Sequence, residues 1–239
     1  MKRICTIDIE SNGLLDQLID FSEFPYKLNS KARLWTVVIT DFNTRKSVFA
    51  EREGITKEWL KNSLEPYDVI VAHNGHKFDL IALQLFGVLE YKIGWLGEND
   101  ICFGREVRFF DSLILSRLFD PNRYGGHSLQ SWGERVGNFK DDYRQQCIDK
   151  GYIEKNSPKG AEFKMFNELL TPYCIQDTLV TLEAFKSLLK EWGQYKNWEA
   201  SVRQEHILAD VSIKREVLGF YFDKELAIEN LEKLTELID

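Results

Sequence analysis

The spacing of hydrophobic residues predicts strands in the first fifty residues of the chain. Each expected strand is an apolar, β-prone run bounded by turn residues, of which Asn12-Gly13 is the clearest. The expected strands cover residues 4–9, 34–40 and 46–50. The chain is therefore expected to open with three antiparallel strands, with a loop over residues 14–32.

Beyond residue 55 the hydrophobic positions change between helical and strand spacing. Residues 68–73 are the β-branched kind of run found in buried parallel strands, and residues 107–110 form a second short run. Pro172 should end one helix and open the next near its first turn, because proline lacks the N–H that a helix interior needs. Helices are expected at residues 56–64, 78–86, 111–118, 128–136, 166–189, 204–218 and 224–237. This order of elements predicts a mixed α/β layer with helices on both faces of the sheet.

The composition is that of a protein with a sizeable core. Of the 239 residues, 44% are hydrophobic and 13% aromatic, which excludes an intrinsically disordered chain. No run of roughly 18 apolar residues occurs, so no membrane span is expected. The 4 cysteines lie far apart without CxxC spacing, which argues against a zinc site and for thiols in a reducing cytoplasm.

The charge of the chain limits how it can bind nucleic acid. The net charge is −7, whereas a protein that bound duplex DNA by phosphate neutralisation alone would normally be basic. If nucleic acid is the partner, binding must be local and metal-assisted, or another protein must supply the affinity.

Two carboxylates at the end of the first strand are the first candidate site. Asp8 and Glu10 are two positions apart, so they point to the same side of a strand. Two acids held side by side raise each other's pKa unless a cation lies between them. A hard divalent ion, Mg²⁺ or Mn²⁺, with oxygen ligands explains the pair, although a solvated strand edge is the alternative.

Two further motifs add acids downstream. Asp79 follows the strand at residues 68–73, and ligands bind at the carboxyl ends of strands in α/β sheets. Its alternative role is that of a helix-capping acid. Tyr173 and Asp177 are four residues apart on a predicted helix, which places a phenol and a carboxylate on one face.

The three motifs together resemble those of a known family. Asp-x-Glu, Asn-x₃-Phe-Asp and Tyr-x₃-Asp, in this order, resemble the three exonuclease motifs of the DEDDy 3′–5′ exonucleases. Residues 73–79, 111–118, 126–137 and 139–143 look like the proofreading domain of the short-tailed-phage branch of family A DNA polymerases. The resemblance covers about residues 3–190. It implies a ribonuclease H-like fold, a mixed sheet that is antiparallel at its start, then parallel, and flanked by helices.

The end of the chain shares this resemblance. Residues 1–195 are expected to form the exonuclease domain, and residues 196–239 a helical segment resembling the connection to a polymerase body. No polymerase motif can be placed, so the sequence leaves open a fragment or a separate exonuclease.

The resemblance implies a role for each motif residue. Asp8, Glu10, Asp79 and Asp177 are expected to hold two Mg²⁺ or Mn²⁺ ions, with Asp8 bridging both. Tyr173 would orient the attacking water together with Glu10, since a phenol both donates and accepts hydrogen bonds. The implied activity is the metal-dependent removal of nucleotides from the 3′ end of single-stranded or frayed DNA.

Other residues near the motifs have two possible roles each. Leu14 is expected to wedge between the last bases of the strand, with an ordinary core leucine as the alternative. Asn74 could contact the substrate backbone or tie the strand end to the next helix. His73 and His76 are expected behind the ligands or in solvent, because hard cations prefer oxygen. Four arginines could contact phosphate but are expected mainly to form a solvated face: Arg105, Arg108, Arg117 and Arg123.

Two rival functions remain open from the sequence. One is an exoribonuclease resembling ribonuclease D, because selectivity depends on how the site treats the 2′-OH. The other is a catalytically silent nuclease fold that acts as a docking module. The expected partners are the 3′ end of single-stranded DNA and a polymerase domain or subunit, in the cytoplasm of the host cell if the chain is phage-encoded.

Overall fold

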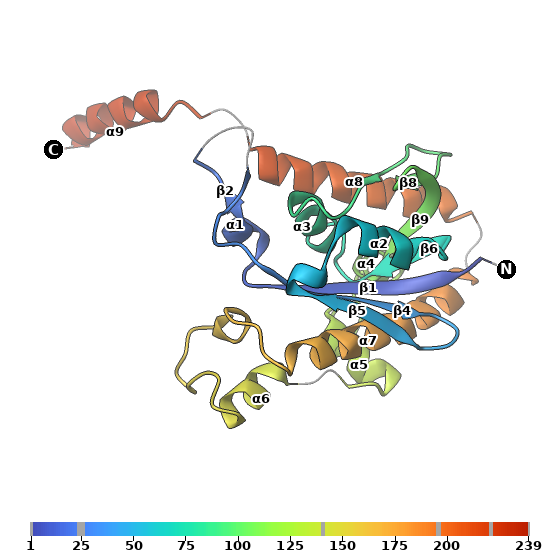
Figure 1. Cartoon of the computed structure of the whole chain (residues 1–239). Helices are drawn as coiled ribbons and strands as arrows, with labels where there is room; N and C mark the ends of the chain where they lie inside the picture. Colours follow the sequence, from blue (N-terminus) through green and yellow to red (C-terminus); the bar gives the residue numbers. More distant parts are fainter. Residues whose placement is uncertain (1, 23–26, 140–141, 195–196, 220–221, 239) are drawn as a thin grey trace.

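The computed structural model describes residues 2–22, 27–139, 142–194, 197–219 and 222–238. Its central strands are β1 (Ile4–Ser11), β4 (Leu34–Asp41), β5 (Ser47–Glu51), β6 (Val69–Ala72), β7 (Tyr91–Lys92), β8 (Asp100–Cys102) and β9 (Arg105–Asp111). Within the described residues they form one sheet in the order β5-β4-β1-β6-β9-β8-β7 (Figure 1). The pairs from β5 to β1 are antiparallel, those from β1 to β9 are parallel, and β8 and β7 add an antiparallel edge. The mixed sheet predicted from the sequence is confirmed.

Helices cover both faces of this sheet. One face packs on α2 (Lys57–Leu64) and α3 (Asp79–Leu85). The other packs on α4 (Ser112–Phe119), α5 (Leu129–Val136) and α7 (Leu170–Trp192). In strand β1, Cys5, Ile7 and Ile9 alternate with polar residues, so these three side chains share one face. All three belong to the core on the side of α2 and α3.

Side-chain caps begin several helices where the sequence predicts them. The Thr56 hydroxyl accepts the Trp59 N–H at 3.1 Å, and the Asp111 carboxylate accepts the Leu113 N–H at 2.9 Å. Each cap satisfies an N–H that has no partner within its own helix.

One local prediction was wrong, another holds in part, and two short strands were not predicted. The described residues of the expected loop over 14–32 include a short helix, α1 (Leu15–Leu18), and a ribbon of β2 (Ile19–Asp20) and β3 (Lys27–Leu28). Helix α7 is continuous, and Pro172 lies in its first turn, where a missing N–H breaks no helical bond. The short strands β7 and β8 carry too few residues for a period to show in the sequence.

The long helix α8 (Glu199–Leu218) is packed on the sheet. The His206 Nε2 accepts the Asp111 N–H at 2.8 Å, and its Nδ1 lies 2.7 Å from the Val202 carbonyl oxygen. Arg203 forms an ion pair of 2.7 Å with Asp100, with side chains 7% and 0% exposed. Burial lowers the pKa of His206 to about 4, so the ring is neutral at pH 7, as these two bonds require.

The remaining helices are α6 (Tyr143–Asp149), α9 (Lys224–Ile238) and the 3₁₀ turns η1 (Arg52–Gly54) and η2 (Ala161–Phe163). Helix α9 is capped by Asp223, whose carboxylate accepts the Leu226 N–H at 2.9 Å. It extends away from the sheet, and none of its residues is buried (Figure 1). The boundary predicted between residues 195 and 196 falls outside the described residues. No helix within the described residues is long and apolar enough to span a membrane.

We expect Arg203→Ala to lower the free energy of unfolding by about 3–5 kcal/mol, because it leaves Asp100 charged, buried and without its counterion. Urea denaturation measures the change. Lys233→Ala is the control, because Lys233 pairs with Glu229 on the exposed face of α9, and its unfolding midpoint should stay at the wild-type value. Equal midpoints for both variants would contradict the packing of α8 on the sheet.

Candidate active site

The two acids of β1 lie on the face of the sheet that α7 covers. Thr6, on the same side of the strand, donates from its hydroxyl to the Thr178 carbonyl oxygen of α7 at 3.0 Å. Asp8 and Glu10 follow at the next positions of that side, and both are half-buried. The strand alternation predicted from the sequence therefore directs both carboxylates toward α7.

Helix α7 brings a phenol, a thiol and a carboxylate to these acids. Cys174 is buried and donates from its Sγ to Asp8 Oδ2 at 3.1 Å. One ligand atom from each of Asp8, Glu10 and Cys174 lies within 4.8 Å of the others. The pKa of Tyr173 is raised, first by burial and then by the negative charges of Asp177, Glu10 and Asp8. Tyr173 therefore keeps its proton at neutral pH.

Asp79, the first residue of α3, approaches Asp8 from the side of the sheet that α2 and α3 cover. The turn before it is held by Asp111, whose carboxylate accepts the Asn74 N–H at 2.9 Å and the His76 N–H at 3.1 Å. Asp79 is 3% exposed, and its pKa is raised well above 3.8 by burial and next by the charge of Asp8. Its Oδ1 is buried without a hydrogen-bond partner in the described part of the chain.

Within the described residues, the structure thus brings ligand atoms of Asp8, Glu10 and Cys174 within 4.8 Å of one another, and Asp79 and Asp177 lie outside this group. Asp8 and Asp79 line a common cavity. The charge of Asp8 raises the pKa of Asp79, and the charges of Asp177 and Glu10 raise that of Tyr173. Burial and the charge of Asp8 both oppose ionisation of Asp79, so this carboxylate is under electrostatic strain without a cation.

Helix α6, held by the segment that follows it, braces Tyr173. The Tyr173 ring stacks on Tyr143, with centroids 4.9 Å apart. The Tyr143 hydroxyl donates to the Glu162 carbonyl oxygen at 3.1 Å and lies 2.8 Å from Asn167 Nδ2. Neither this brace nor Cys174 could be predicted from the sequence. The brace depends on contacts between residues distant in sequence, and Cys174 belongs to no motif with a recognisable spacing.

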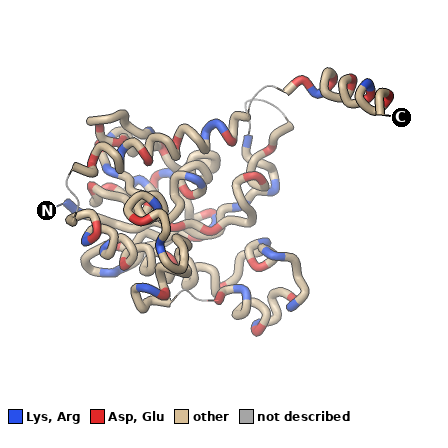
Figure 2. The backbone as a smooth tube through the Cα atoms, turned by 180° about the vertical axis from the view of Figure 1, so that it is seen from behind, with Lys and Arg blue, Asp and Glu red and all other residues tan. Residues whose placement is uncertain are grey.

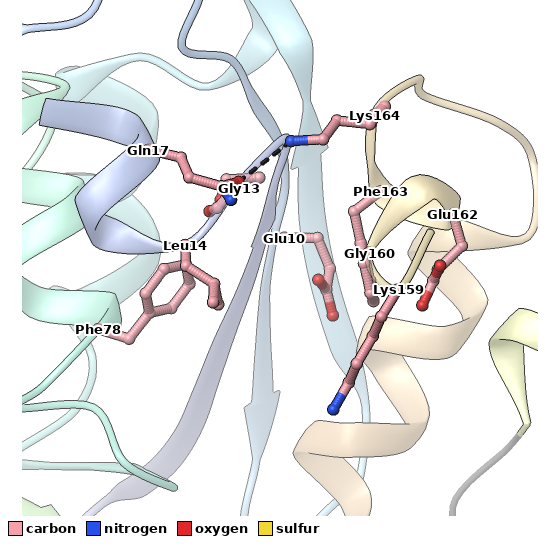
Figure 3. A pocket seen from close by; sticks show the side chains of 11 residues that line it. Glu10, Gly13, Leu14, Gln17, Phe78, Lys159, Gly160, Glu162, Phe163 and Lys164 are labelled. Atoms are coloured by element: carbon pink, nitrogen blue, oxygen red, sulfur yellow. Dashed lines mark hydrogen bonds between the residues drawn. The ribbon is translucent and has the colours of Figure 1, made fainter. Parts of the chain in front are cut away.

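Two cavities open beside the acids, and Leu14 and Phe78 line both. One, of about 420 Å³, also has Glu10, Lys159 and Phe163 in its lining (Figure 3). The other, of about 570 Å³, has Asp8, Asn74, Asp79 and Ile213 among its lining residues. Leu14 is 68% exposed, which excludes the alternative of a core leucine.

The histidines and arginines near the motifs have structural partners. His73 Nδ1 lies 2.8 Å from the Ser112 hydroxyl. His76 is buried rather than in solvent, with its ring centroid 5.0 Å from that of Phe109. Arg105 donates to the carbonyl oxygens of residues 64 and 67, and Arg123 pairs with Glu191 at 2.6 Å. Arg117 is exposed, as expected for a solvated face, and Arg108 lines a separate cavity beside α8.

The donor set of this cluster fits a hard divalent cation. Carboxylate oxygens are the ligands that Mg²⁺ and Mn²⁺ prefer, and the unpartnered Asp79 Oδ1 is a donor atom that such an ion could satisfy. Asp8, Glu10, Asp79 and Asp177 are the residues that could hold it.

No family model matches this sequence. Two curated phage proteins do match it. The DNA-directed DNA polymerase of Escherichia phage T7 is 27% identical over 275 aligned positions, and that of Enterobacteria phage T3 is 29% identical. The chain resembles phage DNA polymerases. The match covers 97% of this chain and 36% of each polymerase, so the chain spans about a third of their length.

Solved structures of the same fold are nucleases and a polymerase. NrnC of Brucella melitensis has a TM-score of 0.56 and 15% identity over 90% of this chain and 85% of its own. The family B DNA polymerase of Pyrobaculum calidifontis has a TM-score of 0.53 and 13% identity over 92% of this chain and 30% of its own. The catalytic core of RRP6 from Trypanosoma brucei has a TM-score of 0.52 and 16% identity over 87% and 46%. The ribonuclease H-like fold predicted from the sequence is confirmed.

We expect Asp79→Asn to stabilise the metal-free protein and to remove part of its response to Mn²⁺. Because the fold raises the pKa of Asp79, wild-type protein in EDTA should lose stability as the pH rises above the ordinary value of 3.8. The amide avoids this loss, so Tm at pH 7 should rise by about 2–4 °C, the effect of ~1 kcal/mol at this chain length. With Mn²⁺, Tm of the wild type should rise by mass action, and that of the variant less.

Thermal unfolding with and without Mn²⁺ measures both effects. Glu236→Gln removes an exposed carboxylate on α9 and is the matched control. It should behave as wild type in both conditions. If Mn²⁺ raised Tm of Asp79→Asn as much as that of wild type, the cation would bind elsewhere.

Proposed function

We propose that the chain is a metal-dependent 3′–5′ exonuclease that removes nucleotides from the 3′ end of single-stranded or frayed DNA. The observation that carries this proposal is that Asp8, Glu10 and Asp79 line two neighbouring cavities, with the charges of Asp8, Glu10 and Asp177 acting on the Tyr173 phenol. The resemblance to phage DNA polymerases supports DNA as the substrate. NrnC of the same fold has been solved with bound Mg²⁺, which supports the choice of metal.

Each carboxylate has a role in this proposal. Two Mg²⁺ or Mn²⁺ ions, when bound, would stabilise the charge that develops on both sides of the scissile phosphate. Asp8, Glu10, Asp79 and Asp177 would hold these ions through their carboxylate oxygens. The Cys174 thiol fixes one oxygen of Asp8 and so limits the directions in which that carboxylate can bind.

Tyr173 and Glu10 would position the water. A phenol that stays protonated can donate to one oxygen while it accepts from another. The stack on Tyr143 holds the ring in place, so little orientation has to be gained when the substrate binds.

Leu14 and Asn74 would act on the substrate strand. Leu14 is exposed and lines both cavities, so it could wedge between the last two bases, a contact that tolerates any sequence. Asn74 lines the second cavity, and its N–H is held by Asp111, which leaves its side-chain amide as the group to contact the strand.

The match to phage DNA polymerases supports a proposal for the domains and for the site of action. We propose that residues 1–195 act as the exonuclease domain and that residues 196–239 lead to a polymerase domain or subunit. The site of action would be the cytoplasm of the host cell.

We expect Asp8→Ala or Asp177→Ala to lower the hydrolysis rate about 10³-fold or more, because each removes a ligand of a cation that supplies several kcal/mol. Tyr173→Phe should be milder, with a loss of about tenfold to a hundredfold, the worth of one hydrogen bond to a charged group. Mononucleotide release from a single strand with Mg²⁺ measures all three. A purified Asp8→Ala variant with rates near wild type would overturn the site.

The direction and substrate can be tested on labelled strands. A 3′-end label should appear at once as a mononucleotide, whereas a 5′-labelled strand should shorten stepwise and a circular strand should stay intact. A duplex should be digested more slowly than a single strand. RNA of the same sequence that is degraded faster than DNA would favour the exoribonuclease, and no hydrolysis of either would favour the docking module.

A further inference from the structure

The cavity beside Glu10 is lined by two lysines in different situations. Lys164 Nζ donates to the Asn12 carbonyl oxygen at 3.0 Å and to Gln17 Oε1 at 3.1 Å, so it links the 159–164 segment to the loop after β1 (Figure 3). Lys159 is exposed and forms no hydrogen bond or ion pair with another described residue. Figure 3 shows its side chain reaching from this segment toward the space beside Glu10.

The backbone that carries Lys159 is held in place on both sides. Arg144 donates to the carbonyl oxygen of Ser157 and, at 3.2 Å, to that of Pro158. Arg144 also pairs at 2.6 Å with Glu162, which is buried. A charged side chain on a fixed loop at the rim of a cavity needs little ordering when a ligand binds.

The charge of the molecule makes a local cation necessary. Lys and Arg are mixed with Asp and Glu along the chain (Figure 2), and the net charge is −7. Four site carboxylates would balance two divalent ions, so the site itself would gain little net positive charge. An anionic strand would therefore need a cation at the cavity, and Lys159 is in that position.

We propose that Lys159 is a phosphate-binding residue for the terminal nucleotide, with its ammonium on a non-bridging oxygen of the phosphate that is released. This rests on the proposed exonuclease function. Water adds to phosphorus as the bond to the 3′ oxygen breaks; that oxygen ends as a hydroxyl and the nucleotide leaves with a 5′-phosphate. Lys159 takes no proton in this step and acts by charge alone. The contact strengthens as the phosphate gains negative charge.

Digestion of single-stranded DNA with Mg²⁺ at several salt concentrations tests the proposal. Lys159→Gln should lower kcat/KM about tenfold to a hundredfold, as for loss of one charge-assisted hydrogen bond, and Lys159→Arg should restore most of it. The slope of log kcat/KM against log salt should become shallower by about 0.7, the value of one single-strand phosphate contact. Lys155→Gln, an exposed lysine outside the cavity lining, should match wild type in all three measurements.

A binding experiment separates this proposal from the exonuclease function. With Mg²⁺, calorimetry should show that wild type binds a 5′-deoxynucleoside monophosphate more tightly than the deoxynucleoside, and that Lys159→Gln loses this preference. Active wild type with unchanged kinetics and unchanged preference in Lys159→Gln would overturn the role of Lys159. If wild type hydrolyses no strand, the exonuclease proposal fails, and the binding comparison still decides whether Lys159 holds phosphate.

Discussion

Like charges brought together at one end of the sheet are the constraint on which the site depends. Asp79 is buried beside Asp8, and both burial and the neighbouring charge raise its pKa. The free energy that holds the two acids together comes from the two hydrophobic cores on either side of the sheet. A divalent cation between the carboxylates would replace this repulsion by attraction. Without a metal, the proximity of the acids lowers the stability of the fold, whereas the proposed function requires that proximity.

The register between β1 and α7 decides whether the acids can meet. Cys5, Ile7 and Ile9 fill one core, so the intervening residues must face α7. The Thr40 hydroxyl lies 2.7 Å from the Thr178 hydroxyl, and the Thr6 hydroxyl donates to the Thr178 carbonyl oxygen. A slip of one residue in β1 would direct the carboxylates into the opposite core, where burial without partners is strongly unfavourable.

The parts of the site that the sequence predicts are those set by local periodicity. Asp8 and Glu10 follow from strand alternation, and the pairing of Tyr173 with Asp177 follows from the helical repeat. Local periodicity could not place Tyr143 beside Tyr173. The two helices that carry these residues are separated in the sequence by an irregular segment. Pro172 lies in the first turn of α7, as predicted, but it ends no earlier helix at residues 166–169. The position of a helix start decides whether a proline interrupts the helix.

The sequence likewise predicts the helix α8 but not the contacts by which it packs on the sheet. His206 accepts the backbone N–H of Asp111, and the Asp111 carboxylate in turn holds the N–H groups of Asn74 and His76 in the turn that precedes Asp79. Two successive hydrogen-bonded steps therefore run from α8 to the turn at the base of the acidic cluster. Ile213 and Glu216 of α8 also line the larger cavity. The helix that resembles a connection to another domain is thus part of the frame that fixes the site, and the position of α3 depends on it.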